Sequence, residues 1–184
     1  MFILFLNFPE SRYNCSMNHS NIILIGMPGA GKSTIGVILA KRIGFDFIDT
    51  DLLIQRLSGK SLQTIINEDG LDHFRRVEEE VLLGLETDRT VIATGGSAVY
   101  SPEAMQHLKK NGLAVFINTP LQTLQTRIAD MSTRGMVISP GESFTELFIE
   151  RNPLYHKYAD RTVNSHSKTI EIIADEIATM LAGR

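Results

Sequence analysis

The segment Gly26-Met-Pro-Gly-Ala-Gly-Lys-Ser-Thr34 combines glycines with a lysine and two hydroxyl side chains. Its spacing matches G-x4-G-K-[ST], a pattern whose backbone N–H groups curl around nucleotide phosphates, since glycines bring no Cβ clash. We expect the Lys32 ammonium to reach the β- and γ-phosphates of ATP and the Ser33 hydroxyl to ligate Mg²⁺. The predicted ATP-binding residues of this segment are Gly29, Ala30, Gly31, Lys32, Ser33 and Thr34.

The alternative for this segment is a glycine-rich structural turn with no ligand. The flanking sequence favours phosphate binding, because the apolar run Asn21–Gly26 predicts a buried strand before the motif. Lys32–Ile43 then predicts an amphipathic helix that stops at Gly44. A strand, a glycine loop and a helix N-terminus in this order present positive backbone dipoles to an anion.

Two carboxylates, Asp49 and Asp51, follow the second predicted strand, Phe45–Asp49. Ligands of open parallel sheets bind beyond the carboxyl ends of the strands. Carboxylates placed there can hold a hydrated Mg²⁺ or accept a hydrogen bond from a substrate hydroxyl. The alternative is helix capping, because Asp is a common N-cap residue; next to a phosphate-binding loop we favour function.

Four of the arginines, spread from residue 75 to residue 151, are candidates for binding anions: Arg75, Arg127, Arg134 and Arg151. Each could be a solvated surface charge or half of an ion pair, for example Arg75 with Glu78 or Glu79 one helical turn on. Phosphoryl transfer, however, needs cations near the γ-phosphate, and an anionic acceptor needs paired N–H donors.

Strands and helices alternate along the chain from residue 21 onward, which predicts a parallel sheet between two layers of helices. The predicted strands are Asn21–Gly26, Phe45–Asp49, Thr90–Thr94, Leu113–Asn118 and Arg161–Asn164. The predicted helices are Lys32–Ile43, Asp51–Leu57, Ser61–Asn67, Asp72–Glu86, Ser101 to Gly112, Thr119 to about Met131, Ser143 to Tyr158, and Thr169–Leu181.

The chain has 184 residues with a net charge of −3, which suits one globular domain and argues against nucleic-acid or anionic-membrane binding. The single cysteine, Cys15, allows no intrachain disulfide, so a cytoplasmic location is expected. Residues 1–18 are apolar at their start but lack a basic segment and a clear cleavage site. We therefore interpret 1–18 as an extension rather than a signal peptide, and 19–184 as the domain.

The order of these motifs over residues 21–182 resembles that of the shikimate kinase family. The matching features are the phosphate loop, Asp49-Thr-Asp51, Phe74-Arg75-x-x-Glu78, Gly95-Gly96, a lid arginine and Arg151-x-Pro-Leu-Tyr155. The resemblance implies a nucleoside-monophosphate-kinase-like fold with a five-stranded parallel sheet. It also implies transfer of the ATP γ-phosphate to the 3-hydroxyl of shikimate, on the route to chorismate and aromatic amino acids, by a monomeric enzyme.

On the acceptor side, the resemblance implies that Asp51 binds the substrate hydroxyls and accepts the proton, while Arg75 and Arg151 clamp the carboxylate. Glu78 would hold those arginines in place. The backbone at the glycine turn would approach the substrate. The implied substrate-binding residues are Asp51, Arg75, Gly95, Gly96 and Arg151.

On the nucleotide side, the resemblance implies that Arg127 stacks on adenine and that Arg134 closes on the phosphates. Arg134 would belong to a mobile lid at about 131–143. The implied catalytic residues are Lys32, Asp51 and Arg134, and the implied metal ligands are Ser33 and Asp49.

Two positions depart from the family pattern: Ser97 replaces a third glycine, and Gly-Met-Val follows Arg134 where the family has Pro-Leu-Leu. Both departures leave a related acceptor open. One alternative is a kinase of another small hydroxy acid such as gluconate, and another is a nucleotide-binding regulatory module without catalysis.

Overall fold

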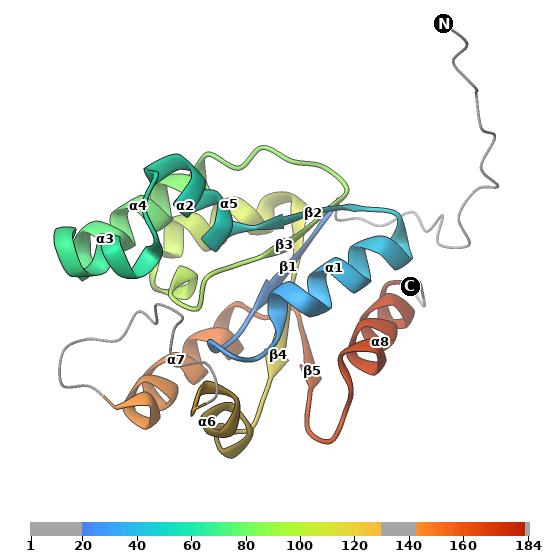
Figure 1. The fold of residues 1–184 in the computed structure, drawn as a ribbon. Helices are drawn as coiled ribbons and strands as arrows, with labels where there is room; N and C mark the ends of the chain where they lie inside the picture. The colour runs from blue at the N-terminus through green and yellow to red at the C-terminus, as the bar shows by residue number, and fades with distance from the viewer. Residues whose placement is uncertain (1–19, 130–142, 183–184) are drawn as a thin grey trace, which may run out of the picture.

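A single parallel sheet forms the centre of the computed structural model, which describes residues 20–129 and 143–182. Its strand order is β2-β3-β1-β4-β5 (Figure 1). The strands are β1 (Asn21–Ile25), β2 (Asp46–Asp49), β3 (Thr90–Ala93), β4 (Gly112–Asn118) and β5 (Arg161–Asn164). Every residue of the central strand β1 is buried, as expected for a parallel sheet covered on both faces.

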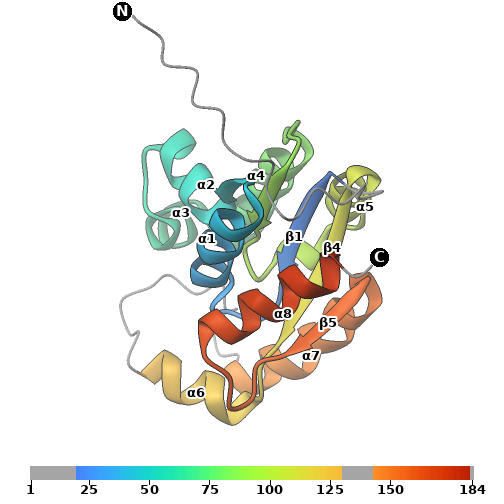
Figure 2. The same cartoon turned by 90° about the vertical axis from the view of Figure 1, so that its right-hand side faces the viewer.

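Helices cover both faces of this sheet, which confirms the predicted three-layer α/β/α class. α1 and α8 lie side by side on one face, and α5 and α7 lie on the other (Figure 2). α2, α3 and α4 pack on one another around a small separate core of Ile54, Leu62, Ile65 and Phe74. The helices are α1 (Lys32–Ile43), α2 (Thr50–Ser58), α3 (Leu62–Asp69), α4 (Leu71–Leu83), α5 (Pro102–Asn111), α6 (Leu121–Ala129), α7 (Phe144–Tyr158) and α8 (Ile170–Ala182), with a 3₁₀ turn η1 (Ala98–Tyr100).

Local capping chemistry sets several of these helix ends. The Ser101 hydroxyl accepts the Ala104 N–H at the start of α5, and Ser143 with Glu146 forms the predicted capping box of α7. α4 ends at Leu83, before the predicted end at Glu86, and Gly84 follows it. The turn η1 was not predicted, because three residues are too few to show a hydrophobic period.

Two predictions fall outside the described residues. They are the N-terminal extension 1–18 and residues 131–142 of the predicted lid, including Arg134. Within residues 20–129 and 143–182, no helix is both long and apolar enough to span a bilayer.

Candidate active site

The loop between β1 and α1 adopts a backbone that its glycines make possible. Gly26, Gly29 and Gly31 have φ values of 145°, 80° and 93°, a region that residues with a Cβ rarely occupy. A Cβ on Gly26 would also lie 2.9 Å from the Ile117 carbonyl oxygen. The sequence therefore folds into the predicted order of strand, glycine loop and helix, and Lys32 begins α1 just after the carboxyl end of the central strand.

Lys32 is buried and turns back onto its own loop. Its Nζ donates to the Gly26 and Met27 carbonyl oxygens at 2.7 and 3.0 Å. Burial lowers the pKa of the Lys32 ammonium to about 8, and the negative charge of Asp51 opposes part of that shift. The charges of Arg151, Asp49 and Glu78 also act on this ammonium. Charged groups from three segments distant in sequence thus lie close enough to act on this lysine.

The two aspartates after β2 have different surroundings. Asp49 is the N-cap of α2, since its Oδ1 accepts the Asp51 and Leu52 N–H groups at 3.0 and 3.3 Å. Capping, the alternative reading of the pair, therefore holds for Asp49. Burial raises the pKa of Asp51 to about 6, and the nearby Lys32 ammonium opposes that rise. A carboxyl with this pKa is mostly ionised at neutral pH and can take up a proton.

The two residues predicted to ligate a divalent cation are Ser33, exposed in the first turn of α1, and the half-buried Asp49. The described residues contain no group of three or more His, Cys, Asp or Glu side chains that could hold a metal alone. Mg²⁺ commonly uses one or two protein oxygens together with substrate phosphates. These donors therefore fit a Mg²⁺ ion that arrives with its nucleotide.

Arg75 of α4 and Arg151 of α7 meet at the ring of Tyr100, at the end of η1. Their guanidinium carbons lie 4.7 Å and 5.1 Å from the ring centroid. Arg151 is 1% exposed, and its Nε donates to the Tyr100 hydroxyl at 3.1 Å. The two arginines predicted to act together are thus brought together by a residue that was not predicted.

The ion-pair alternative for Arg75 is absent among the described residues. Glu78 instead accepts a 2.5 Å hydrogen bond from the Ser97 hydroxyl, and Glu79 accepts one from Ser101 at 2.6 Å. The buried Arg75 Nε has no hydrogen-bond acceptor within the described part of the chain. Its guanidinium therefore keeps donors for a ligand.

Glu78 lies behind this pair of arginines and is 3% exposed. Burial raises the pKa of Glu78 to about 7; the Ser97 hydroxyl bond and the Arg151 charge lower it, and the Asp51 charge raises it. Its Oε1 has no hydrogen-bond partner in the described residues. Ser97, the departure from the third glycine, thus supplies the bond that holds this acid.

The backbone of the Gly95-Gly96 turn is approached closely by other groups. In this structure those groups are side chains of the protein itself. A Cβ on Gly95 would collide with the Glu78 and Asp51 carboxylates, the latter at 2.8 Å. A Cβ on Gly96 would lie 2.9 Å from Pro28 and 3.1 Å from an Arg151 nitrogen. Any side chain at either position would displace the acids or the arginine.

Arg127 of α6 lies beside the phosphate loop, where its guanidinium donates to the Gly29 carbonyl oxygen at 3.1 Å. Its expected role, stacking on adenine, stays a prediction. Arg134 lies outside the described residues, so its expected role stays a prediction.

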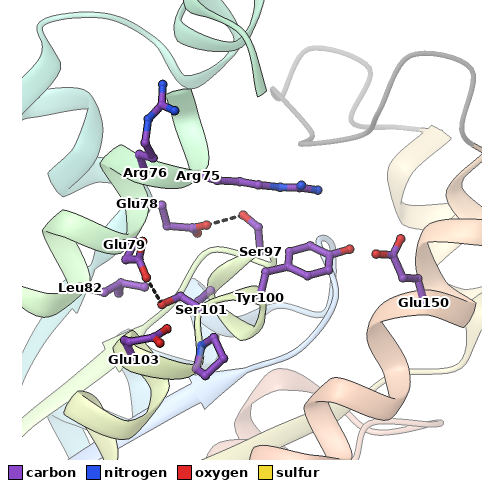
Figure 3. Close-up of a pocket in the computed structure, with 12 residues that line it drawn as sticks. Arg75, Arg76, Glu78, Glu79, Leu82, Ser97, Tyr100, Ser101, Glu103 and Glu150 are labelled. Carbon is purple, nitrogen blue, oxygen red and sulfur yellow. Dashed lines mark hydrogen bonds between the residues drawn. The ribbon is translucent and has the colours of Figure 1, made fainter. Parts of the chain in front are cut away.

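A cavity of about 410 Å³ opens beside the arginine pair, between α4, η1 and α7 (Figure 3). Arg75, Glu78, Ser97 and Tyr100 line it, and none of its lining residues belongs to the phosphate loop. In Figure 3 the Tyr100 hydroxyl points toward Glu150, and the Arg75 side chain extends across the top of the cavity. Of the five predicted substrate-binding residues, only Arg75 lines this cavity, whose lining also includes four glutamates.

Sequence reasoning missed Tyr100 and the bond made by Ser97. Tyr100 follows a recognisable glycine turn, but nothing in its spacing links it to residues 75 or 151. Tyr155 stood in a predicted motif without a role; its hydroxyl donates to the Gly96 carbonyl at 2.7 Å and so anchors the turn.

Comparison with known proteins agrees with this arrangement. A family model described as shikimate kinase matches residues 28–182. The shikimate kinase of Vibrio parahaemolyticus is 35% identical over 167 residues, which cover 89% of this chain and 97% of that protein. The shikimate kinase of Thermodesulfovibrio yellowstonii is 37% identical over 160 residues, which cover 85% and 92%. The structure of shikimate kinase from Acinetobacter baumannii in complex with shikimate matches with a TM-score of 0.83 at 30% identity, over 90% of this chain and 94% of that one. The chain belongs to the shikimate kinase family.

Proposed function

We propose that this protein transfers the γ-phosphoryl group of ATP to the 3-hydroxyl of shikimate, forming shikimate 3-phosphate and ADP. The observation that carries the proposal is that the charges of Asp51, Arg151 and Glu78 all act on the buried Lys32 ammonium. A phosphate-binding lysine, a candidate base and a candidate carboxylate clamp lie at one edge of the sheet. The A. baumannii relative, which binds shikimate, supports the choice of acceptor.

The residues divide the reaction between them. Backbone N–H groups of the Gly26–Thr34 loop and the Lys32 ammonium hold the phosphates and stabilise the charge that develops on the transferring group. Arg75 and Arg151 bind the acceptor carboxylate and so orient its ring. Asp51 accepts a hydrogen bond from the attacking hydroxyl and then its proton, which its pKa of about 6 permits.

Magnesium belongs to the same proposal. Ser33 and Asp49 would hold the ion next to the phosphates, with Asp49 retaining its capping role through Oδ1. The ion would supply positive charge to the β- and γ-phosphate oxygens. Arg127 on the nucleotide side and Arg134 from the predicted lid complete the proposed set of cations. We further propose a cytoplasmic monomer, because the reaction needs ATP and no described site residue requires a second subunit.

A substrate panel tests the proposal. ADP release is measured with shikimate, with gluconate and without an acceptor, and mass spectrometry identifies the phosphorylated product. We expect magnesium-dependent ADP release with shikimate and near-background rates in the other two reactions. Gluconate as the better acceptor would establish the other hydroxy-acid kinase. ATP binding without turnover of either acid would favour the regulatory module.

A further inference from the structure

Tyr100 contacts both arginines of the proposed clamp, Arg75 through its ring and Arg151 through its ring and its hydroxyl. The ring face lies under the Arg75 guanidinium, whose carbon is 4.7 Å from the centroid. The hydroxyl accepts the Arg151 Nε–H at 3.1 Å. An aromatic face attracts a guanidinium, and a hydroxyl acceptor fixes the plane of one. One side chain therefore orients two cations from two helices.

Arg75 depends on this contact more than a typical arginine would. Within the described residues it has no ion pair, and its buried Nε has no acceptor, because Glu78 and Glu79 are bonded to serines. The 410 Å³ cavity beside it leaves room for its guanidinium to swing away. Without the ring, Arg75 would exchange one orientation for many, and a bidentate carboxylate contact needs a fixed plane.

We propose that Tyr100 is a positioning residue of the acceptor site, which sets the Arg75 and Arg151 guanidiniums at the spacing that binds one carboxylate. This inference rests on the proposed function. Tyr100 acts on the carboxylate through the arginines, so its loss weakens recognition of the acid group and leaves nucleotide binding unchanged.

Two substitutions separate the hydroxyl contact of Arg151 from the ring contacts of both arginines. Tyr100→Phe keeps the ring and removes the hydroxyl that Arg151 uses, and we expect the shikimate KM to rise about threefold. Tyr100→Leu removes the ring as well, and we expect a rise of about tenfold or more. The ATP KM should stay within about twofold in both variants. Tyr158→Phe, the same chemical change at the far end of α7, is the matched control.

The decisive readout compares shikimate with its methyl ester, which lacks the negative charge. We expect kcat/KM for the acid to fall in the Tyr100 variants while the smaller kcat/KM for the ester changes little, so that the ratio of the two falls. An equal fall for acid and ester leaves the ratio unchanged; it would mean a structural role only and would overturn the inference. Unchanged kcat/KM values for both substrates would also overturn it. If Tyr100→Leu does not fold, as judged by thermal unfolding, Tyr100→Phe alone decides.

The same assay distinguishes this inference from the proposed function. Wild-type protein that does not phosphorylate shikimate overturns the function and the clamp together. Wild-type protein that turns over shikimate, with Tyr100 variants that keep the wild-type ratio of acid to ester, overturns only the role of Tyr100.

Discussion

The nucleotide half and the acceptor half of the site are built in different ways. The phosphate loop is one contiguous segment, and Lys32 bonds to carbonyl groups of that same segment. The proposed acceptor half draws Asp51, Arg75 and Arg151 from three helices and Gly95 from the loop after β3. Burial raises the pKa values of its carboxyls, Asp51 and Glu78. A contiguous half can be predicted from sequence, whereas an assembled half depends on packing between distant segments. Both halves hold buried charge, an ammonium in the first and carboxyls in the second.

The largest expected effect comes from a substitution in the nucleotide half. Lys32→Ala removes the ammonium that we propose binds the phosphates, and we expect kcat to fall about 10³-fold or more. The fold should survive, because the substitution removes a buried charge whose desolvation is unfavourable. A coupled ADP assay and circular dichroism measure the two outcomes. Lys41→Ala, an exposed lysine on the same helix, is the control. Turnover near the wild-type rate would refute the role of Lys32.

The next effect concerns the pH dependence of stability that the buried carboxyls of the acceptor half should cause. Because the folded pKa of Glu78 is raised from 4.5 to about 7, its contribution to stability is complete below pH 4.5 and is lost as pH rises through 7. Asp51 adds a smaller change of the same sign. We expect the free energy of unfolding to fall between pH 5 and 7.5, by an amount on the order of 2 kcal/mol from Glu78.

Denaturant unfolding of Glu78→Gln across that range provides the measurement. The variant should show a clearly flatter dependence of stability on pH than wild type. Glu80→Gln, an exposed acid on the same helix, should keep the wild-type slope. Equal slopes in all three proteins would mean that the pKa of Glu78 is not raised by folding.

Arg75→Lys tests the acceptor half directly. Lysine keeps the positive charge but loses the planar pair of donors, so we expect the shikimate KM to rise about tenfold with little change in the ATP KM. The adjacent Arg76 is exposed, and Arg76→Lys is the control. If shikimate binding is unaffected by Arg75→Lys, the carboxylate clamp is wrong.

The smallest effect concerns Ser97. Ser97→Ala removes the hydroxyl that donates to Glu78, and we expect a loss of roughly 1 kcal/mol in unfolding free energy with up to about a threefold change in shikimate KM. Ser97→Gly restores the family's residue and adds backbone freedom at φ −91°, so it should be slightly less stable than Ser97→Ala. Thermal unfolding ranks the variants. Two variants as stable as wild type would show that the bond contributes nothing.

Local signals in the sequence determined most of the fold. The alternation of apolar runs and amphipathic segments predicted all five strands, and the capping residues Ser101 and Ser143 marked true helix starts. These features act within a few residues, because strand burial and N-capping depend on neighbouring side chains. The phosphate loop was readable for the same reason.

Only the tertiary structure decided how the acceptor half is assembled. The sequence placed Arg75 and Arg151 in one site by resemblance alone, and it left open whether Glu78 pairs with Arg75. Packing of α4, η1 and α7 answers both questions: Tyr100 joins the arginines, and Ser97 takes the acid. Contacts between residues this far apart produce no recognisable spacing pattern in the sequence, since they form only when the folded sheet brings the three elements together.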